Sequence, residues 1–234
     1  MRRQVVVIGL GRFGVSLVKT LYDMGHNVLA IDNDETAVQS VAAWTTHAVK
    51  ADATDETVLD KMGVRDFDVA VVAMGSAIQS SVLVTIILKQ LGVRYIVARA
   101  DNKLHGAILQ KIGVNKVVSV EEDMGIALAH RLVLSDVSDY VSLAANYGAV
   151  KLVAPNRFVG KSLSQLQFGW KGKWKVAVLL VKRGKEVIVA PELTEIIQPD
   201  DVMMLSGNDE DLEHALAGTG ENDKGEPKGS TSAP

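Results

Sequence analysis

The chain has 234 residues, of which 47% are hydrophobic and 5% aromatic, and it contains no Cys, which excludes disulfide and thiolate chemistry. With 25 Lys and Arg against 28 Asp and Glu, the formal net charge of −3 provides no basic excess for nucleic-acid binding. The longest apolar runs, such as 69–74 and 176–181, are far shorter than the roughly 18–20 residues of a membrane-spanning helix, and no signal peptide is visible. We therefore expect a soluble, cytoplasmic protein.

Up to residue 135, short β-branched runs alternate with longer amphipathic segments, which is typical of parallel βα units. The predicted strands are 4–8, 27–31, 47–51, 68–73, 95–98 and 116–119. The predicted helices are 12–24, 34–43, 55–62, 78–91, 103–112 and 121–134. Six strands with intervening helices predict an α/β fold, with a Rossmann-type doubly wound parallel sheet in residues 1–135.

The second part of the chain is rich in predicted strands. Residues 136–148 are predicted to be a linker, and residues 149–217 a second, smaller α+β domain with a hairpin turn at 183–185. Its predicted strands are 149–154, 174–181, 186–190 and 202–206, and its predicted helices are 162–166 and 209–217. The last segment, 218–234, has a single Ala as its only apolar residue and is predicted to be a disordered tail.

A glycine loop opens the first predicted helix. Residues 9–14 read Gly-Leu-Gly-Arg-Phe-Gly, the pattern G-x-G-x-x-G, and follow an apolar strand. Gly9 would allow a tight turn, Gly11 would let phosphate oxygens approach the backbone, and Gly14 would let the helix pack against the strand. The alternative is that these glycines serve only a tight turn.

Asp32 ends the second predicted strand, 18 residues after Gly14, close to the spacing of about 20 in dinucleotide-binding folds. Its carboxylate would accept hydrogen bonds from the hydroxyl groups of a ribose. A 2′-phosphate would meet that carboxylate, and Asn33, which follows, brings no positive charge. The sequence therefore predicts a nucleotide with a free ribose diol and disfavours NADP.

Arg12 lies inside the loop, where dehydrogenases usually keep a small or apolar residue. A guanidinium group beside the phosphates suits a di- or triphosphate, and the alternative is a solvated residue of the first helical turn. We find no arrangement of nucleophile and base and no His cluster with metal-ligand spacing, and interpret the five His as surface or hydrogen-bonded residues. We therefore predict a protein without catalytic activity, with an NAD(H)-dependent oxidoreductase as the alternative.

Further segments resemble RCK (regulating conductance of K⁺) proteins, and most closely the cytosolic regulatory subunits of Ktr/Trk potassium uptake systems. With the glycine loop, the resemblance rests on residues 51–54 (Ala-Asp-Ala-Thr), 72–75 (Val-Ala-Met-Gly) and 120–125 (Val-Glu-Glu-Asp-Met-Gly). Residues 150–216 resemble the smaller C-terminal RCK domain. The resemblance covers nearly all of the chain except the tail.

The resemblance implies a subunit that senses ATP or ADP and gates a membrane potassium channel, with an NAD(H)-responsive regulator of the same architecture as the alternative. It implies dimers that assemble into an octameric ring at the cytosolic face of the membrane. The implied nucleotide-binding residues are Gly9, Gly11, Arg12, Phe13, Gly14, Asp32, Asn33, Asp52, Ala53, Met74, Gly75 and Arg99.

The resemblance also gives two charged residues specific roles. Arg12 would reach the γ-phosphate, including that of the neighbouring subunit's nucleotide. Glu121 would help to bind Mg²⁺ or Ca²⁺ at the dimer interface, with further oxygen ligands from the nucleotide or the partner chain. The alternative role of Glu121 is a favourable negative charge at a helix N-terminus.

Two segments of the second domain stand apart. Residues 163–169 lack the Asp and the Arg of the pattern that binds cyclic di-AMP in some members of the family, so we expect no cyclic di-AMP site. Residues 170–175 contain alternating Trp and Lys. This segment is either an interaction surface or an amphipathic loop with two half-buried indoles.

Overall fold

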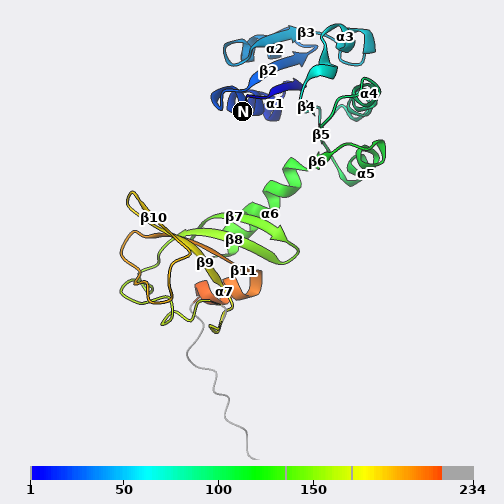
Figure 1. Ribbon diagram of the computed structural model, residues 1–234. Helices are drawn as coiled ribbons and strands as arrows, with labels where there is room; N and C mark the ends of the chain where they lie inside the picture. Colours follow the sequence, from blue (N-terminus) through cyan, green and yellow to red (C-terminus); the bar gives the residue numbers. More distant parts are fainter. Residues whose placement is uncertain (1, 135, 170, 218–234) are drawn as a thin grey trace, which may run out of the picture. The chain divides into compact units, whose positions relative to one another are not determined.

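The computed structural model describes residues 2–134, 136–169 and 171–217 of the chain. They form two compact units, which divide between Asp123 and Met124 (Figure 1). The predicted tail, 218–234, lies outside the described residues. Within the part that the structure describes, no helix combines the length and the apolar composition needed to cross a membrane.

A six-stranded parallel sheet forms the centre of the first unit, in the order β3-β2-β1-β4-β5-β6. Its strands are β1 (Gln4–Ile8), β2 (Asn27–Asp32), β3 (His47–Lys50), β4 (Val69–Val72), β5 (Ile96–Arg99) and β6 (Lys116–Val118). All six predicted strands form, and their ends differ from the prediction by at most one residue. The predicted Rossmann-type sheet is therefore confirmed.

Helices follow the strands of this sheet in the predicted order. They are α1 (Arg12–Asp23), α2 (Glu35–Val41), α3 (Glu56–Lys61), α4 (Ile78–Gln90), α5 (Lys103–Ile112) and α6 (Val120–Val133), with short 3₁₀ helices at Ala42–Trp44 and Val64–Asp66. Residues alternate between the two faces of each strand, so Val5 and Val7 join one apolar cluster while Val6 and Ile8 join another. Strands buried on both faces explain the many Val and Ala residues.

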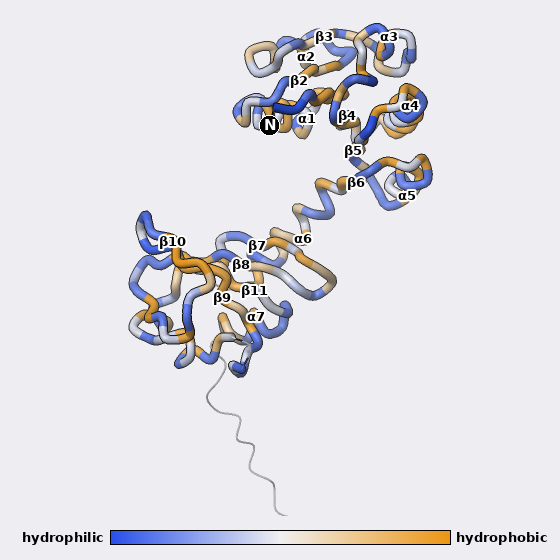
Figure 2. Tube along the Cα trace, in the orientation of Figure 1, coloured by the Kyte–Doolittle hydropathy of each residue, from blue (hydrophilic) through white to orange (hydrophobic). Residues whose placement is uncertain are grey.

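The second unit contains a five-stranded antiparallel sheet in the order β10-β9-β11-β8-β7. Its strands are β7 (Val137–Ala144), β8 (Tyr147–Val153), β9 (Ala177–Arg183), β10 (Glu186–Val189) and β11 (Val202–Asn208), and helix α7 (Asp209–Ala217) follows. Figure 2 shows the hydrophobic colour along β9 and the hydrophilic colour in the turn after it. Arg183 pairs with Glu186, so the turn consists of Gly184 and Lys185. It lies within the hairpin turn that the sequence predicts at 183–185. The smaller α+β domain is confirmed.

Two predictions for the second unit are wrong in detail. The predicted linker 136–148 contains β7, and the units divide instead within α6. Strand β7 lies at the edge of its sheet and buries only Tyr140, so its sequence lacks the apolar alternation that would reveal a strand. The predicted helix 162–166 does not form, because Ser162 pairs as an isolated bridge with Ile196. The N–H of Leu163 likewise donates to the carbonyl of Glu195.

Candidate functional site

A cavity of about 290 Å³ opens where strands β1, β2, β4 and β5 end, at the carboxyl edge of the parallel sheet. Strand β1 lies between β2 and β4, so chain order reverses at this point of the sheet. Open parallel sheets bind ligands at such switch points. Nine of the predicted binding residues line the cavity: Gly9, Gly11, Asp32, Asn33, Asp52, Ala53, Met74, Gly75 and Arg99.

The glycine loop forms one wall of the cavity and packs tightly on itself. Gly9 has a φ of +97°, which favours glycine, and its N–H donates to the carbonyl of Ile31 at 2.9 Å. A Cβ atom on Gly14 would lie 2.0 Å from the carbonyl oxygen of Gly9, so only glycine fits there. A Cβ atom on Gly11 would meet no protein atom within 4 Å, because this residue faces the cavity.

Backbone N–H groups fix the Asp32 carboxylate at the cavity. Oδ2 accepts a hydrogen bond from the N–H of Leu10 at 2.6 Å, and Oδ1 accepts one from the N–H of Asp34 at 2.9 Å. Each carboxylate oxygen has two lone pairs, so both keep the capacity to accept a hydrogen bond from a ligand. The bond to Leu10 joins the end of β2 to the glycine loop, a contact that the sequence does not reveal.

A second carboxylate, that of Asp52, lines the same cavity. Its Oδ1 accepts hydrogen bonds from the hydroxyl group of Thr54 at 2.7 Å and from the N–H of Thr54 at 2.9 Å. These two bonds lower the pKa of Asp52 below its usual value, so it carries a negative charge at neutral pH.

Two helices begin at the cavity without a side-chain cap. The N-cap of α1 is Gly11 and that of α4 is Ala77, and both residues line the cavity. By contrast, the side chains of Asp34, Asp55 and Asn102 cap α2, α3 and α5. First-turn N–H groups without a cap carry partial positive charge and fit the oxygens of an anion such as phosphate.

The start of α4 adds residues that sequence reasoning missed. Ser76 and Ser80 line the cavity beside Ala77. Neither is among the predicted binding residues, although the loop after β4 and the first turn of α4, at the carboxyl edge of the sheet, could have indicated them.

Arg99 reaches the cavity from the end of β5 and lies against Gly75, where an added Cβ atom would come within 2.6 Å of its Cζ atom. Its guanidinium group pairs with the carboxylate of Glu121, the predicted metal ligand, in the first turn of α6. The buried Nε atom of Arg99 has no hydrogen-bond partner among the described residues. No group of three or more acidic or His side chains that could hold a metal ion occurs in the described ranges.

Three predicted residues of the glycine loop do not line the cavity. Arg12 is exposed at the first position of α1, and Phe13 packs against an apolar cluster of the sheet. Gly14 lies behind the loop, against Gly9. The structure thus places the backbone of the loop, rather than the Arg12 side chain, at the cavity.

The histidines lie outside the cavity lining. His105 of α5 is fully buried, which lowers its pKa, and its Nδ1 accepts a hydrogen bond from the N–H of Asp101 at 3.3 Å. Its Nε2 atom has no partner among the described residues, so His105 is neither a surface residue nor a fully hydrogen-bonded one. His130 stacks on Tyr140, with ring centroids 3.8 Å apart.

The Trp- and Lys-containing segment is described in part. Trp174 is partly buried against the core of the second unit, and the Nζ atom of Lys173 lies 4.3 Å from the centre of its ring. Trp170 lies outside the described residues. The indole of Trp174 therefore fits the half-buried alternative.

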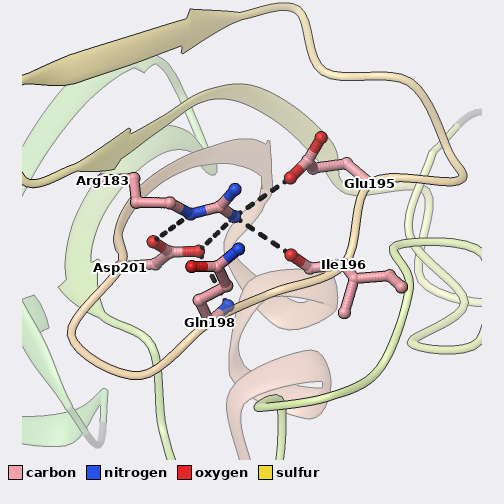
Figure 3. Close-up of polar contacts among 5 residues, drawn as sticks. All are labelled: Arg183, Glu195, Ile196, Gln198 and Asp201. Atoms are coloured by element: carbon pink, nitrogen blue, oxygen red, sulfur yellow. Dashed lines mark hydrogen bonds and ion pairs between the residues drawn. The ribbon is translucent and has the colours of Figure 1, made fainter.

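A separate polar cluster occurs in the second unit (Figure 3). The guanidinium of Arg183 donates to both carboxylate oxygens of the fully buried Asp201, at 3.0 and 2.8 Å, and to Glu195 at 3.0 Å. Burial alone would raise the pKa of Asp201, but the bonds from Arg183 and from the N–H of Gln198 outweigh burial and lower it. These groups satisfy one another, so the cluster is structural.

Comparison with known proteins follows the division into two units. The TrkA-N domain family matches residues 5–120, and the TrkA-C domain family matches residues 148–217. Ktr system potassium uptake protein C of Bacillus subtilis is 42% identical over 212 residues, covering 91% of this chain and 95% of that protein. Ktr system potassium uptake protein A of Vibrio alginolyticus is 33% identical, covering 92% and 96% respectively.

Solved structures show the same fold. The crystal structure of the GsuK RCK domain has a TM-score of 0.63 at 15% identity, covering 94% of this chain and 49% of that one, so this chain spans about half its length. The TrkA-N domain of the inner membrane protein ybaL from Escherichia coli has a TM-score of 0.51 at 18% identity, covering 56% of this chain and 98% of that one. Given these matches to both units, the chain belongs to the TrkA-N/TrkA-C family that includes the Ktr system potassium uptake proteins.

Proposed function

We propose that this chain is a nucleotide-sensing regulatory subunit of a membrane potassium transporter, and that ATP and ADP are its ligands. Its relatives in the Ktr system are potassium uptake proteins by name. They align over at least 90% of this chain, so the similarity extends over both units.

The Asp32 carboxylate carries the assignment of a nucleotide. Two backbone N–H groups hold it at the cavity wall, where the uncapped ends of α1 and α4 also open. An ionised carboxylate suits ribose hydroxyl groups, whereas helical N–H groups suit phosphate oxygens. A nucleotide supplies both kinds of group in one molecule.

The cavity can hold such a ligand. Its volume of about 290 Å³ lies at the lower end of the range for small-molecule pockets. Gly11 leaves open space at the start of α1, and Arg99 brings a positively charged side chain to the cavity lining. When bound, the nucleotide supplies negative charge at the edge of the sheet. This chain's residues then bind and orient it.

NAD or NADH is the second candidate ligand. One solved structure with the same fold is the GsuK channel bound to NAD, with a TM-score of 0.61 at 15% identity, covering 97% of this chain and 41% of that one. NAD contains the same adenosine diphosphate unit, so Asp32 and the start of α1 would serve either ligand. The chain would then be an NAD(H)-responsive regulator of the same architecture.

We include assembly in the proposal: dimers that form an octameric ring and dock on a potassium channel subunit at the cytosolic face of the membrane. Helix α6 supports subunit contacts, because none of its residues is buried and apolar side chains such as Met124, Leu132 and Val133 are exposed. Arg12, exposed at the start of α1, is available to a neighbouring subunit's nucleotide. Glu121 would hold Mg²⁺ or Ca²⁺ together with oxygens from outside its own chain.

Titration calorimetry of the full chain with ATP, ADP, NAD and NADH tests the proposal. We expect adenine nucleotides to bind, and Asp32→Asn to weaken every ribose-bearing ligand about tenfold, because hydrogen bonds to charged groups contribute roughly 1.5–3 kcal/mol. Asp34→Asn is the matched control, since Asn also caps helices and Asp34 does not line the cavity. If none of the four ligands binds, the proposed function is wrong.

A further inference from the structure

Arg99 occupies a fixed position at the wall of the cavity. Its side chain is 19% exposed and lies against the backbone of Gly75, which lines the same cavity. A guanidinium has five N–H donors, and the buried Nε–H of Arg99 has no partner among the described residues. Because Nε is buried, an anion in the cavity would have to approach the outer guanidinium nitrogens, one of which pairs with Glu121.

The present partner of Arg99 is a side chain of the first turn of α6. Glu121 pairs with the guanidinium, yet the side chain of Glu121 is 66% exposed. Helix α6 continues past the boundary between the units at Asp123 and Met124. The ion pair thus links the cavity wall to the helix that leads out of the first unit.

The next residue provides a contrast. Glu122 belongs to the same first turn, and its carboxylate lies 3.7 Å from the Nζ atom of Lys103. Neither Glu122 nor Lys103 lines the cavity. Of these two adjacent carboxylates, only Glu121 pairs with a cation that lines the cavity.

We propose that the Arg99–Glu121 ion pair is a ligand-sensitive latch, in which an anionic group of the nucleotide competes with Glu121 for Arg99. Binding then weakens the hold of Arg99 on the first turn of α6. This inference rests on the proposed nucleotide binding and describes how occupancy of the cavity is passed to α6. Coupling is reciprocal, so weakening the Arg99–Glu121 pair also favours binding by the same factor.

The expected coupling is modest. Glu121 is largely solvated, and exposed ion pairs contribute little, which corresponds to about a two- to fivefold change in affinity. The competition is electrostatic, so its size depends on the charge that the ligand brings to Arg99. An uncharged nucleoside gains nothing from the loss of Glu121, whereas a nucleotide does.

Calorimetry with Glu121→Gln and the matched control Glu122→Gln tests the latch, with adenosine, AMP, ADP and ATP as probes and with EDTA present, so that no divalent cation links Glu121 to the nucleotide. We expect Glu121→Gln to bind the nucleotides about two- to fivefold more tightly than the wild type and to leave adenosine binding unchanged. Glu122→Gln should match the wild type for all four probes. Equal tightening by both variants, or equal tightening of adenosine, overturns the latch, because either shows a general loss of negative charge.

Hydrogen exchange of the peptide that spans the first two turns of α6 gives a second readout. In the wild type, saturating ADP should increase exchange there, whereas Glu121→Gln should exchange faster without ligand and show no further increase. The outcomes separate the two proposals. Tight nucleotide binding by the wild type with no effect of Glu121→Gln overturns the latch alone, while no nucleotide binding by the wild type overturns the proposed function and the latch together.

Discussion

The two units of this chain differ in whether their polar groups have hydrogen-bond partners within the protein. In the first unit, polar backbone groups lie open at one edge of the sheet, because the N-termini of α1 and α4 have no side-chain cap and both begin at the cavity. In the second unit, Arg183, Asp201 and Glu195 satisfy one another. Groups left open suit a ligand, whereas groups that pair internally hold a fold together. We therefore propose the first unit as the place of ligand binding and interpret the second as a structural frame.

Replacing Arg183 should destabilise the second unit, and this is the largest effect that we expect. Arg183→Ala leaves the buried carboxylate of Asp201 without its cation, which costs about 3 kcal/mol, the lower end for buried pairs, because Arg183 is itself partly exposed. Calorimetric unfolding should show the transition of the second unit lowered by roughly 12–24 °C. Nucleotide affinity should be unchanged.

Lys182→Ala is the control for this variant, since Lys182 is an exposed neighbour on the same strand. It should leave both transitions in place. A loss of nucleotide affinity in Arg183→Ala would contradict the proposal that the first unit binds the ligand independently of the polar cluster in the second unit.

Gly14→Ala tests the first unit. A Cβ atom there would lie 2.0 Å from the carbonyl oxygen of Gly9, so the glycine loop must shift, which costs about 1–3 kcal/mol. Denaturant unfolding should show lower stability of the first unit, and calorimetry should show weaker nucleotide binding. Gly106→Ala, in α5 of the same unit, is the control, because the nearest atom to its added Cβ atom lies at 3.5 Å, an ordinary van der Waals distance. If Gly14→Ala bound nucleotide as the wild type does, the loop would have no part in the site.

Acidification should lower the stability of the two units in different pH ranges, and the effect is smaller than that of the substitutions. Burial lowers the pKa of His105 below its usual 6.5, so the unfolded chain takes up a proton more readily, and the first unit loses stability as the pH falls below about 6.5. The loss is at most about 1.4 kcal/mol for each pH unit. The pKa of Asp201 is also lowered, so its contribution to the second unit is present above about pH 3.8 and is lost below that.

The measurement is urea unfolding of the wild type and of His105→Gln between pH 7.5 and about 5. The wild type should lose stability in this range relative to the variant, and only in the transition of the first unit. Parallel pH profiles for the two proteins would show that His105 does not titrate in this way.

The fold of the first unit could be predicted from the sequence because its periodicity is local. Each strand and the helix after it are neighbours in the chain, and their apolar spacing differs clearly. The sequence of the second unit contains fewer such local patterns. Edge strand β7 buries only Tyr140, and the segment around Ser162 pairs with the distant Ile196 instead of forming a helix.

In the candidate site, too, local sequence patterns reveal some features and not others. The glycine pattern and Asp32 are visible in the sequence because their spacing follows from one βαβ unit. The bond from Leu10 to Asp32, the pairing of Arg99 with Glu121 and the approach of Ser76 and Ser80 are contacts across the sheet edge. Such contacts depend on how the strands are ordered, which no local pattern encodes.

The glycine at the N-cap of α1 has a further consequence for the abundance of the protein in the cell. Asp or Asn at position 11 would cap the helix and add roughly a few tenths of a kcal/mol of stability, yet the chain has Gly11 there. In the proposed complex, a phosphate group of the nucleotide would cap the helix instead, so ligand binding and stability would be linked by mass action. Under such linkage, a cell depleted of the ligand would hold a larger unfolded fraction of this chain and would degrade it faster. The abundance of the protein would then follow the supply of the molecule it binds.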